Sequence, residues 1–192
     1  MFERVVDALR SHNIETIVVD TADEARTAVL AMIPDGAEVY TGKSKTLEDT
    51  GLFAELVESG RYDALRPRMM AMDRTTQGRE IRKLIAAPDF VLGSVAAVTH
   101  DGTLVAASAT GSQLGPYVAG AARVILVVGS QKIVADLDEA MRRIREVVFP
   151  WENERVRERL GVDTALEKVL LIFGEWREGR TTVVLVREPV GV

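Results

Sequence analysis

The spacing of apolar residues in the N-terminal part of the chain switches between a helical and an extended period. Residues 1–11 place apolar side chains at helical spacing, and residues 14–19 form a β-branched run typical of a strand. Thr21 can cap a helix over residues 22–32, and residues 37–41 are predicted to form a second short strand. This order of helix, strand, helix and strand is typical of a parallel α/β sheet.

Further along the chain, glycine-containing turns separate short apolar runs. Residues 90–92 and 124–128 have the continuous apolar pattern of strands that are buried on both faces. The spacing predicts an amphipathic helix over residues 136–148, and two closing strands over residues 169–173 and 181–186. No repeat or flexible linker marks a second domain.

These elements predict one α/β domain over residues 1–192, with a largely parallel sheet covered by helices on both faces and a C-terminal strand pair. A chain of this length can bury most of its apolar surface without disulfides, and it contains no cysteine. The lack of cysteine also excludes a thiol nucleophile and a cysteine-held iron–sulfur cluster in these residues. No group of His, Asp and Glu has metal-ligand spacing, so we predict neither a metal site nor a bound cofactor.

Net charge and hydropathy argue against two classes of partner, nucleic acids and membranes. The formal net charge of -5 argues against a role dominated by contacts with nucleic-acid phosphates. Residues 1–10 lack the apolar core of a signal peptide, and the longest apolar runs are far shorter than the ~20 residues that span a bilayer. We therefore expect a cytoplasmic protein that associates with neither nucleic acid nor membrane.

A glycine-lysine loop follows the second predicted strand. It lacks the first glycine of a nucleotide-binding P-loop, because Ala37 stands at that position. Backbone N–H groups and two lysines at the start of a predicted helix, which Thr46 can cap, still favour a bound anion. A solvated basic turn explains the same pattern equally well. The candidate anion-binding residues here are Gly42, Lys43, Ser44, Lys45 and Thr46.

Two more polar turns and a lysine complete the candidate binding site. Each turn follows or adjoins an apolar strand, and ligands bind where the carboxyl ends of parallel strands meet. We therefore expect the three turns to line one pocket, with Lys132 as a point charge for the same ligand. An ordinary helix N-cap and a solvated lysine are the alternatives. The additional candidates are Gly93, Ser94, Thr110, Gly111, Ser112, Gln113 and Lys132.

Candidate acids and bases are few. Residues 99–103 have the pattern of a hairpin turn built on Asp-Gly, in which His100 could act as a general base with Asp101 as its partner. The pattern favours exposed turn residues instead, because neighbouring residues at a strand end point in different directions. Glu48 is the third candidate acid or base.

The segments over residues 42–52, 93–113 and 127–134 resemble the LUD family, the lactate-utilisation-type proteins. The similarity covers essentially the whole chain and is greatest to compact, cysteine-free members. It implies a fold similar to that of ribose-5-phosphate isomerases, glucosamine-6-phosphate deaminases and CoA transferases. It also implies ligand binding at glycine-rich strand ends, and association with redox subunits. Fold kinship alone does not establish a substrate.

Three functions are compatible with these observations. The first is an accessory or metabolite-binding protein of lactate or hydroxy-acid utilisation, which binds a small anionic metabolite beside an iron–sulfur or flavin partner protein. The second is an isomerase- or transferase-type enzyme that acts on a phosphorylated or CoA-linked metabolite. The third is a structural or regulatory interaction module. We favour the first; the closing strands could also complete an interface in a homo-oligomer.

Overall fold

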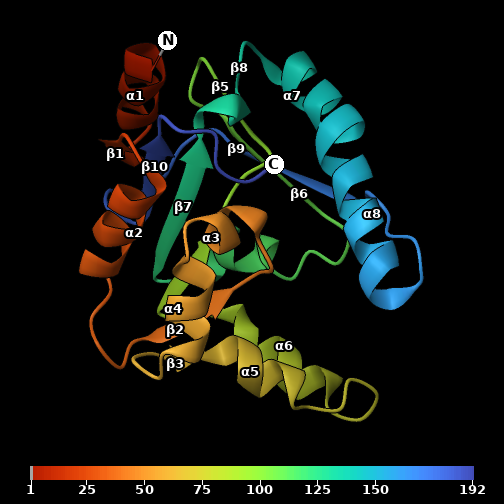
Figure 1. Cartoon of the computed structure of the whole chain (residues 1–192). Coiled ribbons are helices and arrows are strands. Elements are labelled where there is room, and N and C mark those ends of the chain that lie inside the picture. Colours follow the sequence, from red (N-terminus) through yellow and green to blue (C-terminus); the bar gives the residue numbers. More distant parts are fainter. Residues whose placement is uncertain (1) are drawn as a thin grey trace.

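A six-stranded parallel sheet lies at the centre of the computed structural model, which describes residues 2–192 (Figure 1). Met1, which the sequence pattern assigns to the first helix, lies outside the described residues. All neighbouring strands pair in parallel, so their carboxyl ends lie at one edge of the sheet. In sheet order, the strands are β1 (Glu15–Val19), β10 (Thr181–Val186), β7 (Arg123–Gly129), β4 (Phe90–Gly93), β2 (Glu38–Thr41) and β3 (Asp63–Ala64).

The central strand β7 shows why the apolar runs form strands that are buried on both faces. Successive side chains of a strand point to opposite faces, so a continuous apolar run supplies both. Val124, Leu126 and Val128 pack in one core, whereas Ile125 and Val127 pack in the core on the opposite face. Each such side chain contributes roughly 1.5–3 kcal/mol when it is fully buried.

Helices cover both faces of this sheet. The helices α2 (Ala22–Ala31), α3 (Lys45–Asp49) and α4 (Leu52–Glu58) supply apolar residues to one core. The helices α1 (Phe2–Ser11), α5 (Leu65–Met70) and α6 (Gly78–Ala86) supply the other. Thr21 caps α2 through a reciprocal pair of bonds with Glu24, as the sequence predicts.

A second, four-stranded sheet packs beside the first and shares one of its cores. Its opposite face meets a long helical segment built from α7 (Leu137–Arg143), a π-helical turn (Ile144–Val148) and α8 (Phe149–Leu160). This segment forms one side of the molecule in Figure 1. The strands in sheet order are β8 (Ile133–Val134), β5 (Ala97–Thr99), β6 (Leu104–Ser108) and β9 (Lys168–Ile172).

The fold class agrees with the prediction of an α/β protein whose largely parallel sheet is flanked by helices. The structure corrects the predicted strand pair, because β9 and β10 form but belong to different sheets. Every residue of β10 is buried, which suits the interior of a sheet, whereas β9 is partly exposed and lies at an edge. None of the helices within residues 2–192 has the length and apolar character needed to cross a membrane.

Candidate functional site

Three adjacent strands end at the same edge of the central sheet and bring their following loops together. The strands β2, β4 and β7 end at Thr41, Gly93 and Gly129, and β4 lies between the other two. The segment after β2 contains α3, and the segment after β7 is a single 3-10 turn, Ser130–Lys132. Polar side chains from all three segments therefore meet at this edge.

Lys132 is the centre of this meeting point and is only 4% exposed. Its Nζ donates hydrogen bonds to Thr46 Oγ1 at 2.8 Å and to Ser94 Oγ at 2.9 Å. Ser94 Oγ itself donates to the carbonyl oxygen of Val127 at 2.7 Å, so the lone pairs of this hydroxyl are free to accept from the ammonium. The lysine is thus held in place by hydroxyls, and no carboxylate hydrogen-bonds to it among the described residues.

Burial changes the acid–base behaviour of this lysine. The pKa of Lys132 is lowered to about 7, chiefly by burial, with a further contribution from the Arg143 guanidinium that the Asp49 carboxylate opposes. Near neutral pH the amine therefore exchanges between its charged and neutral forms. Such a group can hold an anion when it is charged, and it can accept a proton when it is neutral.

Arg143, at the end of α7, is a site residue that the sequence analysis did not identify. Its Nε donates to the carbonyl oxygen of Ala96 at 3.0 Å, and its buried Nη2 has no hydrogen-bond partner within residues 2–192. Burial lowers the pKa of Arg143, as it does for Lys132. The one sequence signal was its position three residues after the buried Ala140, at the border of the apolar face of the helix.

The segment that follows β10 closes the site from solvent. Gln131 Nε2 donates to the carbonyl oxygens of Val190 and Gly191, at 3.0 Å and 3.3 Å. The N–H of Gly191 donates to Asp49 Oδ2 at 3.0 Å. Gly191 has a φ of 79°, and a Cβ there would collide with the Thr46 hydroxyl and crowd the Lys132 ammonium. Only glycine therefore fits this covering position.

The loop after β2 contributes its predicted residues in different ways. The structure corrects the predicted cap, because Ser44 precedes α3 and Thr46 lies buried inside the helix, where its hydroxyl reaches Lys132. Lys45 forms an ion pair with Asp49, and Lys43 is exposed. The helix has five residues, which is too short for its N-terminus to carry an anion site by itself.

The other two predicted turns differ in their closeness to Lys132. Ser94 contacts its ammonium directly, whereas the preceding Gly93 leaves room for the buried Tyr117 ring. The hydroxyls of the turn over residues 110–113 bond mainly within their own loop. This turn approaches the first loop at one point, where a Cβ on Gly42 would lie 3.9 Å from that of Gln113. Thr46, Ser94 and Lys132 thus meet, whereas Thr110, Gly111 and Ser112 form no hydrogen bond with that group within residues 2–192.

The candidate acids and bases do not join the Lys132 group. Asp101 accepts hydrogen bonds from both Thr99 and Thr103, which makes its carboxylate part of the hairpin turn. The Nε2 of His100 is buried without a partner among the described residues, and no bond links it to Asp101. Glu48 faces α8, where Arg155 Nη2 lies 2.6 Å from its Oε1. No group of three or more potential metal ligands is present within residues 2–192.

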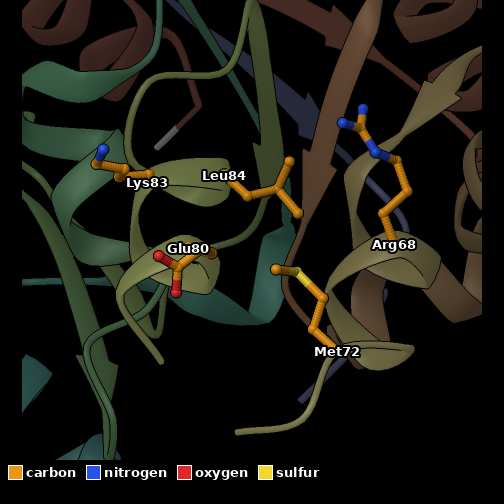
Figure 2. A pocket seen from close by; sticks show the side chains of 5 residues that line it. All are labelled: Arg68, Met72, Glu80, Lys83 and Leu84. Atoms are coloured by element: carbon orange, nitrogen blue, oxygen red, sulfur yellow. The ribbon is translucent and has the colours of Figure 1, made fainter. Parts of the chain in front are cut away.

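A separate apolar groove lies between α5 and α6, with a volume of about 610 Å³ (Figure 2). Figure 2 shows Met72 and Leu84 pointing toward each other across it, with Arg68, Glu80 and Lys83 at its rim. None of these residues belongs to the group around Lys132. The groove has no convergent polar groups of the kind that orient a substrate, so the Lys132 group remains the candidate site.

Comparison with known proteins defines the class of protein. A model of the LUD domain family matches residues 2–186, so this chain belongs to the LUD family, which is associated with lactate utilisation. A crystal structure of a DUF162 family protein from Deinococcus radiodurans is similar to it, with a TM-score of 0.55 and 15% sequence identity. The match covers 96% of this chain and 94% of that chain, and at this identity it concerns the fold alone. A comparison with curated proteins gives no match.

Proposed function

We propose that this LUD protein binds a small organic anion at Lys132 and Arg143, as a metabolite-binding accessory protein of lactate or related hydroxy-acid utilisation in the cytoplasm. One observation carries the proposal. The buried Lys132 ammonium feels the charge of the half-buried Arg143 guanidinium, whose buried Nη2 has no partner within residues 2–192. Burying like charges side by side is costly unless a counter-charge joins them. A ligand carboxylate or phosphate supplies that counter-charge.

The groups around the two cations suit a hydroxy acid. An arginine can bind a carboxylate through two parallel N–H bonds, and the Lys132 ammonium adds a third charge-assisted bond. The hydroxyls of Ser94 and Thr46 can exchange hydrogen bonds with a hydroxyl on the adjacent carbon. Ligand entry requires residues 190–191 to move, because they cover the ammonium. The chain has no cysteine, so the redox step belongs to an iron–sulfur or flavin partner protein in this proposal.

Calorimetry with lactate, a sugar phosphate and a CoA ester tests the proposal. Lys132→Met and Arg143→Gln each remove a charge-assisted hydrogen bond of typically about 1.5–3 kcal/mol, so we expect affinity to fall roughly ten- to a hundred-fold. Lys45→Ala is the matched control, since this lysine pairs with Asp49 and lies outside the group. Unchanged binding in both site variants would overturn the assignment of these two residues. A wild-type protein that binds none of the three ligands would overturn the proposal itself.

A second function, an isomerase- or transferase-type enzyme, is favoured by one specific observation. Lys132 is a buried amine with a near-neutral pKa, which is the property of a lysine that acts as a general base. Such a base would remove a proton from the carbon next to a bound carbonyl group. Exchange of that proton for deuterium in heavy water, with loss of the exchange in Lys132→Met, distinguishes this enzyme from a binding protein.

A further inference from the structure

Four basic side chains gather beside the loop that follows β2 and form what we call the basic cluster. They come from that loop, from α5 and from α8, which are distant in sequence. None of them takes part in the contacts of Lys132. The cluster consists of Lys43, Arg66, Arg155 and Arg159.

Two members of the cluster are anchored on opposite sides of the loop. Arg66 Nη1 donates to the carbonyl oxygen of Thr41 at 3.3 Å, and its guanidinium carbon lies 5.7 Å from the centre of the Phe53 ring. Arg155 pairs with Glu48, and the side chain of this arginine is only 16% exposed. These contacts hold two guanidinium groups at defined positions, with the exposed Lys43 between their anchor points in the sequence.

The charges of the cluster are close enough to disturb one another. The pKa of Lys43 is lowered, first by partial burial and then by Arg155, with weaker effects of Arg159 and Arg66. Two carboxylates face the same region, those of Glu48 and Glu152, and burial raises the pKa of Glu152. The four cations of the cluster outnumber these two carboxylates, and Arg74 adds a further positive charge near Arg66.

We propose that the basic cluster is a phosphate subsite, and that the ligand of this protein is an organic phosphate. A phosphate monoester carries a charge of about −1.5 to −2 at neutral pH, which suits a region of excess positive charge. Guanidinium groups suit it because each can bind two phosphate oxygens at once. A nucleic acid is a poor fit, since the chain is acidic overall and the cluster is limited to four side chains.

The position of the cluster relative to Lys132 indicates that one ligand can reach both. The helical segment from α7 to α8 is continuous, with Arg143 beside Lys132 and Arg155 in the cluster. The two sites also share α3, on which Thr46 bonds to Lys132 and Glu48 pairs with Arg155. We infer an organic phosphate whose acidic or carbonyl end reaches Lys132. This last step, unlike the phosphate subsite, rests on the proposed function.

Calorimetry with inorganic pyrophosphate at constant ionic strength tests the subsite without reference to Lys132. The variant Lys43→Gln/Arg159→Gln changes two exposed side chains that form no ion pair among the described residues, so it should fold normally. We expect its affinity for pyrophosphate to fall about ten- to a hundred-fold, because two charged donors are removed. The matched control Lys83→Gln removes an exposed lysine of α6 and should leave the affinity unchanged.

Three results would overturn the phosphate subsite: no saturable binding of pyrophosphate at millimolar concentration, an equal loss in Lys83→Gln, or a loss confined to Lys132→Met. The last result would place the anion at Lys132 and so support the proposed function while rejecting the cluster. Conversely, pyrophosphate binding could depend on the cluster while Lys132→Met leaves the affinity for every organic acid tested unchanged. That result would reject the proposed function and keep the phosphate subsite. An oligonucleotide that binds the cluster more tightly than pyrophosphate would overturn the assignment of a small ligand.

Discussion

Two buried cations lie at opposite ends of two neighbouring strands of the central sheet and have different surroundings. Arg180, just before β10, is 8% exposed and donates to three backbone carbonyls, while its Nη1 lies 2.6 Å from the Glu175 carboxylate. Lys132, just after β7, is as deeply buried but donates to two hydroxyls and to no carboxylate among the described residues. The first charge is fully compensated within the protein, and the second is not.

This difference separates a structural cation, Arg180, from the cation of the candidate site, Lys132. Arg180 joins the π-helical turn before β7 to the start of β10, and each of its three nitrogens has a partner. A compensated ion of this kind holds segments together. The uncompensated charge of Lys132 costs stability in the empty protein, which is typical of sites that keep binding energy for a ligand. The contrast yields three measurements, described here from the largest expected effect to the smallest.

Arg180→Ala should cause the largest loss of stability. It leaves Glu175 buried without its counter-charge and three carbonyls without a donor, and breaking a buried ion pair typically costs about 3–5 kcal/mol. Urea unfolding measures the change in the free energy of unfolding. Arg187→Ala is the control, since Arg187 and Asp20 form an exposed pair, and we expect a loss of about 1 kcal/mol or less. Equal losses in the two variants would contradict the structural role of Arg180.

Lys132→Met should have the opposite sign and raise stability at pH 7, by about 1–3 kcal/mol after the loss of two hydrogen bonds. The folded pKa of about 7 lies below the ordinary value of 10.5, so between these values the unfolded chain holds more protons. Wild-type stability therefore rises from pH 7 toward pH 10, and the advantage of Lys132→Met shrinks over that range. Thermal unfolding as a function of pH measures it, with Lys45→Met as control. A variant less stable than wild type at pH 7 would make Lys132 a structural cation like Arg180.

Asp101→Ala should have the smallest effect and sharpen the boundary of the site. The pKa of Asp101 is lowered, first by its bond from Thr99, so its carboxylate stabilises the hairpin turn above its ordinary pKa and loses this effect as the pH falls. We expect a loss of about 1 kcal/mol in urea unfolding and no change in anion affinity. Asp101→Asn keeps one acceptor oxygen and should lose less. A large loss of anion binding in both variants would instead show that Asp101 contributes to the binding site.

The sequence predicted the local elements well, because their signals are local. Short apolar runs such as residues 124–128, capping at Thr21 and the Asp-Gly turn at residues 101–102 depend only on neighbouring residues. It also singled out Ser94, Thr46 and Lys132, since polar residues that follow buried strands must reach the edge of the sheet. The role expected of Thr46 as a helix cap was wrong, because the capping position of α3 is Ser44, two residues earlier, and the Thr46 hydroxyl reaches Lys132 from inside the helix.

By itself, then, the sequence determined the α/β class, most strands and helices, and the sheet edge at which residues of the candidate site lie. Only the tertiary structure decided which polar groups meet there, since Arg143 lies outside the apolar face of the predicted amphipathic helix and residues 190–191 come from the end of the described chain. It also decided that β9 and β10 part into two sheets. The physical reason is that hydrophobic periodicity depends on residues close in sequence. The burial and the protonation of a group depend instead on segments that are distant in sequence and pack around it in the fold.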